Sequence, residues 1–314
     1  MSQGLRSTVL HLMPICVLLV LCFVLPAYHR DNFARILVLA TYAMGYNMLF
    51  GYTGLLSLGH ALFFGAGMYG MGLAVLHGGL PAAPAFLAGV ATAAVVSLVI
   101  AALALRTVGV AFMIVTLMFA QAGYLLVLYF GSWTRGDEGF VIARDMRNIG
   151  GFDLTDPVTR YLAALALFSV VLLTIARMVH GAFGHVLVGI RENEARARML
   201  GYDVRAHKLA AAVVSGTIAG AAGAAYGLLF GYVGATFISV QYSIYPLLWV
   251  ILGGAGTTLG PLIGTFFMFY LIDWSSGLTS AYMLVAGMVL VLLVLFARTG
   301  ILGEIRKRWV PWLP

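Results

Sequence analysis

Two long blocks of this sequence carry almost no charge. Between residues 36 and 134 the only charged side chain is Arg106, and between residues 209 and 297 it is Asp273. Charged residues make up 9% of the chain, against about 25% in soluble domains. So few charges cannot cover a water-facing surface, which excludes a soluble enzyme, a nucleic-acid-binding domain and a disordered chain. The blocks predict an integral membrane protein in a lipid bilayer.

The apolar residues divide into segments that suit membrane crossing, at about 20 residues per helix. We predict an all-α, polytopic membrane helix bundle with about 8–10 transmembrane or partly spanning helices. The predicted crossings are 9–27, 34–50, 55–76, 83–105, 109–130, 159–179, 209–232, 241–252, 258–273 and 279–297. Segment 9–27 is longer than a typical signal core and is expected to be the first membrane helix. Segment 241–252 is too short to span alone, so we expect it to be re-entrant or strongly tilted.

The charged loops orient the predicted bundle. Residues 177–208 carry six basic and three acidic side chains, whereas residues 135–160 carry four basic and five acidic ones. The positive-inside rule therefore predicts that 181–207 is a cytoplasmic loop and that 131–158 is an external loop. Arg30 and Arg35 are exceptions, because this topology places them outside. The net charge of +7 is then explained by topology, and no nucleic-acid partner is expected.

Glycine is patterned in two regions. Gly216, Gly220, Gly223, Gly227, Gly231 and Gly234 recur every three or four residues, which puts them on one face of a helix. Small residues let membrane helices approach closely, so this face is predicted to pack inside the bundle, with direct solute contact as the alternative. A weaker stripe comprises Ser57, Ala61, Gly65, Met68 and Gly72. The run 253–261 is dense in Gly and Pro, and predicts either a broken helix beside a pathway or a plain surface turn.

Motifs for chemistry are missing from the sequence. The two lysines, Lys208 and Lys307, do not stand in a phosphate-binding loop, and there is no nucleophile elbow. The histidines form no metal-type cluster, and Cys16 and Cys22 are expected to be free thiols. We therefore predict no enzyme activity, cofactor or metal. His60 is expected to be a satisfied interior histidine, and Asp273 an interfacial residue rather than a proton relay.

One polar segment stands out. Residues 189–201 predict a short amphipathic helix that ends at Gly201 and docks on a partner. The alternative is a solvated loop with an ion pair between Glu194 and Arg198.

Several segments together resemble the branched-chain amino acid ABC transporter permease family. The segment from Gly51 to Gly72, which begins GYTGLLSLGH, resembles a characteristic family segment, and RENEARARMLG (191–201) resembles its cytoplasmic loop. The segments SGTIAGAAGAAY (215–226) and LGGAGTTLGPLIG (252–264) match downstream ones in order. The match is best to the M-type subunit. At 134–139, TRGDEG resembles the family pattern TGGDxG, but Arg135 departs from it.

The resemblance implies a single transmembrane permease domain over 1–314 in the bacterial inner membrane. It implies partners: a second homologous permease, two cytoplasmic ATPase subunits and a periplasmic substrate-binding protein. The coupling residues would be Arg191, Glu192, Glu194, Ala195, Arg196, Arg198 and Gly201. Candidate packing or pathway residues are Gly54, Ser57, Gly59, His60, Gly216, Gly220, Gly223, Gly227, Gly253, Gly254 and Gly256.

The expected function is an importer subunit for branched-chain amino acids or related small polar solutes, driven by ATPases on separate chains. The alternative is a secondary transporter or channel that works alone. Ion-coupled transporters usually need intramembrane acidic residues. Such residues are nearly absent from this sequence, and their scarcity favours the ATPase-driven importer.

Overall fold

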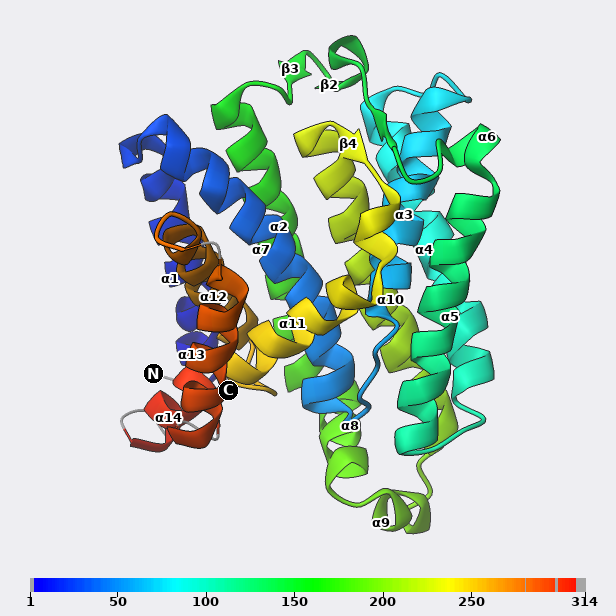
Figure 1. Ribbon diagram of the computed structural model, residues 1–314. Coiled ribbons are helices and arrows are strands. Elements are labelled where there is room, and N and C mark those ends of the chain that lie inside the picture. The colour runs from blue at the N-terminus through cyan, green and yellow to red at the C-terminus, as the bar shows by residue number, and fades with distance from the viewer. Residues whose placement is uncertain (1–2, 280, 297–298, 309–314) are drawn as a thin grey trace.

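The computed structural model describes the backbone of residues 3–279, 281–296 and 299–308, and forms a bundle of α-helices (Figure 1). Its helices are α1 (Gln3–Val24), α2 (Ala27–Asn47), α3 (His60–Leu76), α4 (Ala82–Ala104), α5 (Val110–Tyr129), α6 (Gly131–Thr134), α7 (Pro157–His180), α8 (Ala182–Glu192), α9 (Glu194–Met199), α10 (Val204–Phe230), α11 (Val240–Gly253), α12 (Gly260–Ser276), α13 (Tyr282–Phe296) and α14 (Gly300–Arg308).

Short elements connect these helices. η1 (Met48–Tyr52) is a π-helical turn, and η2 (Arg144–Met146) and η3 (Ala235–Ile238) are 3-10 turns. β1 (Phe140–Val141) pairs antiparallel with β4 (Tyr232–Val233), and β2 (Asn148–Ile149) pairs antiparallel with β3 (Phe152–Asp153).

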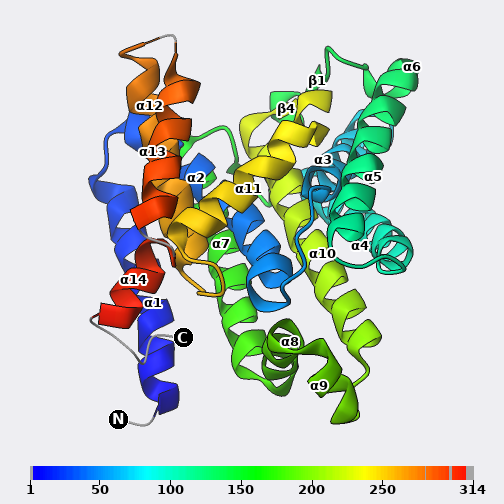
Figure 2. The same cartoon turned by 60° about the horizontal axis from the view of Figure 1, so that its bottom comes forward.

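The predicted all-α membrane bundle is confirmed. Each of the ten predicted crossings coincides with one helix, namely α1–α5, α7 and α10–α13. In the described residues, five helices are long and apolar enough to cross a bilayer: α2 continued by η1, α4, α5, α7 and α10. α11 has only 14 residues and runs obliquely across the middle of the bundle in both views (Figures 1 and 2).

α10 is the central helix, packed against α2, α3 and α4. Its glycines allow the close approach: a methyl group at Gly223 would overlap the carbonyl oxygen of Phe64, and one at Gly220 would overlap Ala93. The prediction that all six patterned glycines share one helical face is wrong at its end. Gly231 caps α10 with φ +74°, which ends the helix, and Gly234 lies beyond it in extended backbone.

The prediction of one helix over 55–76 is wrong in its first turn. α2 ends in η1, residues 53–59 are not helical, and α3 begins only at His60. The non-helical backbone is satisfied by side chains: the Tyr46 hydroxyl donates to the Ser57 carbonyl at 3.0 Å, and the Leu58 amide donates to Thr116 Oγ1 at 3.2 Å. Ser57 therefore does not belong to the α3 stripe.

The single helix predicted over 189–201 is also wrong, because Asn193 divides it. Asn193 is extended, with φ −158° and ψ 99°, and its side chain accepts a hydrogen bond from the Arg196 amide at 2.9 Å. Asn in this conformation is a strong N-cap, so a new helix, α9, starts after it. The predicted ion pair between Glu194 and Arg198 is present within α9.

The polar loops lie at opposite ends of the bundle. α8 and α9 form one end, and the segment with β2 and β3 lies at the other (Figure 1). At the β2–β3 end, Asp156 caps α7 by accepting from the Thr159 amide at 2.9 Å. Asp31 pairs with Arg35 and with Arg160 at the start of α7, so one of the two arginines that the charge rule could not accommodate has an acidic partner.

Candidate coupling site at the α8–α9 end

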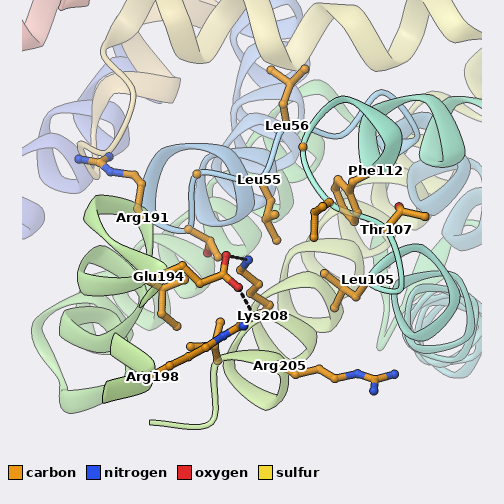
Figure 3. Close-up of a pocket in the computed structure, with 16 residues that line it drawn as sticks. Leu55, Leu56, Leu105, Thr107, Phe112, Arg191, Glu194, Arg198, Arg205 and Lys208 are labelled. Atoms are coloured by element: carbon orange, nitrogen blue, oxygen red, sulfur yellow. Dashed lines mark hydrogen bonds and ion pairs between the residues drawn. The ribbon is translucent and has the colours of Figure 1, made fainter. Parts of the chain in front are cut away.

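A cavity of about 440 Å³ lies where α8 and α9 meet the bundle. Residues 53–56, the turn before α5 and one face of α8, α9 and α10 line it (Figure 3). Its charged residues are Arg191, Glu194, Arg198, Arg205 and Lys208. Three predicted coupling residues therefore lie beside the non-helical segment that contains Gly54.

Glu194 attaches α9 to α10. Its Oε1 accepts from Nη2 of Arg198 at 2.5 Å, and its Oε2 accepts from Nζ of Lys208 at 2.6 Å. The hydrogen bond from Lys208 lowers the pKa of the Glu194 carboxyl below its ordinary value. The Lys208 side chain is 13% exposed and that of Arg198 67% exposed, so solvent screens the Lys208 pair less.

Arg191 attaches α8 to two breaks in the membrane helices. Its side chain points away from the cavity (Figure 3), and its Nη1 donates to the Gly51 carbonyl in η1. A methyl group at Gly256, in the α11–α12 turn, would lie 3.0 Å from Nη1 of Arg191, and one at Gly54 would lie 2.7 Å from its Cγ. Glycine at 54 and 256 therefore leaves room for this arginine.

Asn47 joins the same two breaks. Its Nδ2 donates to the Thr257 carbonyl at 2.8 Å, and its Oδ1 accepts from the Gly256 amide at 2.9 Å. Asn47 is 1% exposed. We call Asn47, Gly51, Arg191, Gly256 and Thr257 the Asn47 junction. It connects the α8–α9 end to η1 and to the α11–α12 turn.

Comparison with known proteins gives the family. Residues 31–296 match the model of the family described as "Branched-chain amino acid transport system / permease component". The chain belongs to this family.

Two relatives of the permease cover most of its length. It is 27% identical over 288 residues to the high-affinity branched-chain amino acid transport system permease protein LivM of Escherichia coli strain K12, which covers 84% of this chain and 68% of that protein. It is 28% identical over 289 residues to the LivM protein of Salmonella typhimurium strain LT2, with the same shares. No solved structure gives a significant match.

The other predicted coupling residues of the permease face away from the junction. Glu192 and Arg196 line a second groove of about 490 Å³ between α8 and α9, and Ala195 is exposed. Gly201, with φ +86°, follows the end of α9. The same tip exposes Met199 and Leu200, at 86% and 70%, which the sequence reasoning missed. The signal available in the sequence for an exposed apolar contact was this pair of adjacent apolar residues after a charged helix.

The candidate glycines fall into two groups in the permease. Gly54 and Gly256 meet at Arg191, and Gly254, with φ +120°, shapes the same turn. Gly253 packs against the backbone of α12, and Gly59 against that of Thr116. Gly216 and Gly227 instead pack with Gly220 and Gly223 on α3 and α4, away from the junction. The Gly-rich run 253–261 is thus a largely buried break between α11 and α12 that Asn47 holds through Gly256 and Thr257.

His60 is fully buried in the permease. Its Nε2 lies 2.7 Å from Ser215 Oγ, and Ser215 Oγ donates to the Gly45 carbonyl at 2.5 Å. Because the serine proton points to Gly45, Nε2 of His60 is the donor of this pair. The hydrogen bond between His60 and Ser215 joins α3 to α10. Elsewhere in the bundle, Asp273 near the end of α12 accepts a hydrogen bond from the Tyr28 hydroxyl. Among the described residues, no cluster of His, Cys, Asp and Glu could hold a metal.

Proposed function

We propose that the chain is the transmembrane permease subunit of a bacterial ATP-binding-cassette importer for branched-chain amino acids or related small polar solutes. Family membership and the names of the two relatives support the transport class and the solute class. The observation that carries the coupling role is the Asn47 junction, because it links an exposed polar tip to two helix breaks within the bundle.

The proposed assembly contains a second homologous permease, two cytoplasmic ATPase subunits and a periplasmic substrate-binding protein, in the bacterial inner membrane. The α8–α9 tip is the proposed contact with an ATPase subunit. Exposed Met199 and Leu200 would enter an apolar pocket, and Glu192, Arg196 and Arg198 would form its charged rim. An apolar centre with a polar rim is the usual anatomy of a protein interface.

The proposed mechanism is alternating access. Closure of the ATPase subunits moves α8 and α9 together, because Asn193 caps α9 directly against the end of α8. Arg191 transmits this movement to the Gly51 carbonyl, and Asn47 transmits it from η1 to the α11–α12 turn. Hinges form at loops and at the ends of helices, so the two breaks are the positions where the bundle would change between an inward and an outward state.

A co-purification experiment tests this proposal. Met199→Asp with Leu200→Asp is expected to reduce the ATPase subunits that co-purify with the tagged permease at least tenfold and to abolish ATP-dependent uptake, with unchanged permease in the membrane. The matched control is Phe152→Asp, which alters a residue that is 69% exposed in β3 at the opposite end. Normal ATPase recovery and uptake in the double variant would refute the contact. Uptake by the purified chain without nucleotide would instead support a stand-alone transporter.

A further inference from the structure

A second feature of the bundle lies away from the coupling site. A cleft of about 490 Å³ separates α5 from η3 and the start of α11. Polar and aromatic side chains line it: Gln121 and Tyr124 from α5, Thr236 from η3, and Ser239, Gln241 and Tyr245 around the first turns of α11. No charged side chain from the described residues lines this cleft.

The cleft lies near the middle of the membrane-spanning region. Gln121 is the twelfth residue of α5, a helix of 20 residues that starts at Val110. At about 1.5 Å per residue, it lies roughly 17 Å along a helix of about 30 Å. This is the depth at which the bilayer contains hydrocarbon and no water.

Four polar side chains of the cleft have no hydrogen-bond partner among the described residues. Within the described part of the chain, the side chains of Gln121, Thr236, Ser239 and Gln241 make no hydrogen bond, and none of the four is buried. Exposed hydroxyls on other outer helix faces behave differently. Thr92 Oγ1 donates to the Ala88 carbonyl at 2.8 Å in α4, and Thr174 Oγ1 to the Val170 carbonyl at 2.7 Å in α7.

This contrast separates two kinds of outer surface. A hydroxyl that faces lipid is satisfied by its own helix backbone, because hydrocarbon offers no partner. Amide side chains left without a protein partner at this depth would be costly against hydrocarbon. Gln121 therefore requires a polar partner outside the described residues, which water or a bound polar molecule can supply.

We propose that this cleft is one wall of an aqueous solute pathway and that it binds a small solute of no net charge, neutral or zwitterionic, with an apolar portion. The inference rests on the proposed function and adds the location and chemistry of the solute contact. Neutral amides and hydroxyls bind polar groups without requiring a counter-charge. The tyrosine rings offer flat apolar surface, and their faces attract an ammonium group. Tyr245 is part of that surface, since its ring stacks on Trp249 at 5.9 Å between centroids.

Thiol accessibility tests the aqueous wall. In the complete transporter in vesicles, Cys16 and Cys22 are first replaced by Ala, and Gln121→Cys is compared with Ala122→Cys. Ala122 is an exposed neighbour at the same depth that does not line the cleft. A charged, membrane-impermeant methanethiosulfonate is expected to modify the thiol at 121 at least tenfold faster than that at 122 and to stop uptake of leucine, the probe solute. Only a thiol in contact with water forms the reactive thiolate.

Two results would overturn the inference. The first is a thiol at 121 that reacts no faster than the one at 122, because lipid or a partner subunit would then cover the cleft. The second concerns binding. Gln121→Leu is expected to raise the leucine concentration for half-maximal uptake about tenfold, and Gln121→Asn is expected to give a value between those of the parent and of Gln121→Leu. An unchanged value in Gln121→Leu would refute solute contact. Uptake by the parent lacking Cys16 and Cys22 is measured in the same vesicles. If that parent shows no ATP-driven uptake, the proposed function fails. If the parent transports normally and either of the two results above occurs, only the cleft assignment fails.

Discussion

Replacing Asn47 by Ala is expected to destabilise the permease and to uncouple ATP hydrolysis from uptake. Asn47 is 1% exposed and bridges the chain to a turn more than 200 residues away. The substitution leaves the Gly256 amide and the Thr257 carbonyl without their partner. Each unsatisfied buried group costs about 1–3 kcal/mol, although side-chain hydrogen bonds in membrane bundles average about 0.6 kcal/mol when measured directly. We therefore expect a loss of about 2–4 kcal/mol, because two backbone groups are orphaned at once.

The matched control for Asn47→Ala lies in the same helix. Thr41 is fully buried in α2, and its Oγ1 donates to the Leu37 carbonyl at 2.9 Å. Thr41→Val removes this bond and orphans no group, because the helix amide of residue 41 still pairs with that carbonyl. Its expected cost is below about 1 kcal/mol.

Two assays measure the Asn47 effect. Denaturant unfolding of the purified complex in detergent reports the stability difference, and uptake per ATP hydrolysed in vesicles reports coupling. Asn47→Ala is expected to retain ATPase activity and to lose most uptake per ATP. If Asn47→Ala destabilises no more than Thr41→Val and transports with normal stoichiometry, the junction neither holds the α11–α12 turn nor couples it to ATP hydrolysis.

Two further predictions concern the polar ends. The Glu194 carboxyl has a folded-state pKa below its ordinary value of 4.5, so its contribution is complete above pH 4.5 and is lost as the pH falls through the lower, folded value. Hydrogen exchange of the α9 amides, corrected for intrinsic rates, is expected to accelerate in the native protein as the pH falls below 4.5. The Lys208→Met variant is expected to exchange fast both above and below this pH. If this variant is as protected as the native chain at pH 7, the pair of Glu194 and Lys208 does not hold α9. Arg135 is the only non-glycine residue with positive φ, at +62°, in the described part of the chain, and the family pattern has glycine there. Arg135→Gly is therefore expected to stabilise the chain by about 0.5–1 kcal/mol in denaturant unfolding, whereas Gly136→Ala, at a neighbouring φ of +55°, destabilises it; a loss of stability in Arg135→Gly would contradict the strain argument.

The order of the ten apolar segments that form helices was predictable from the sequence. Each apolar segment carries its own reason to cross a bilayer, because transfer to hydrocarbon depends on composition over about 20 residues and little on distant contacts. The Gly-rich face of α10 was predictable for the same reason, since helical periodicity is a local property. The order of motifs from Gly51 to residue 264 also sufficed to suggest the family.

One helix break was decided by tertiary structure and another by local capping. The backbone at 53–59 leaves the helix because Thr116 and Tyr46, from α5 and α2, satisfy its polar groups. Asn193 divides the predicted coupling helix by local capping, a signal that a contiguous amphipathic pattern concealed.

The site depended on contacts that no sequence pattern records. Arg191 is 140 positions from Gly51, and Asn47 is 210 from Thr257. Asn47 is a polar residue in an apolar segment, which indicates that its side chain has a polar partner. Its partners are backbone groups, so their positions cannot be identified from residue types. The sequence alone determined which segments enter the membrane, because that free energy is summed locally. Only the folded bundle decided where the membrane segments break at η1 and at the α11–α12 turn, because an unpaired backbone group in hydrocarbon is stable only beside a partner that the fold brings from far along the chain.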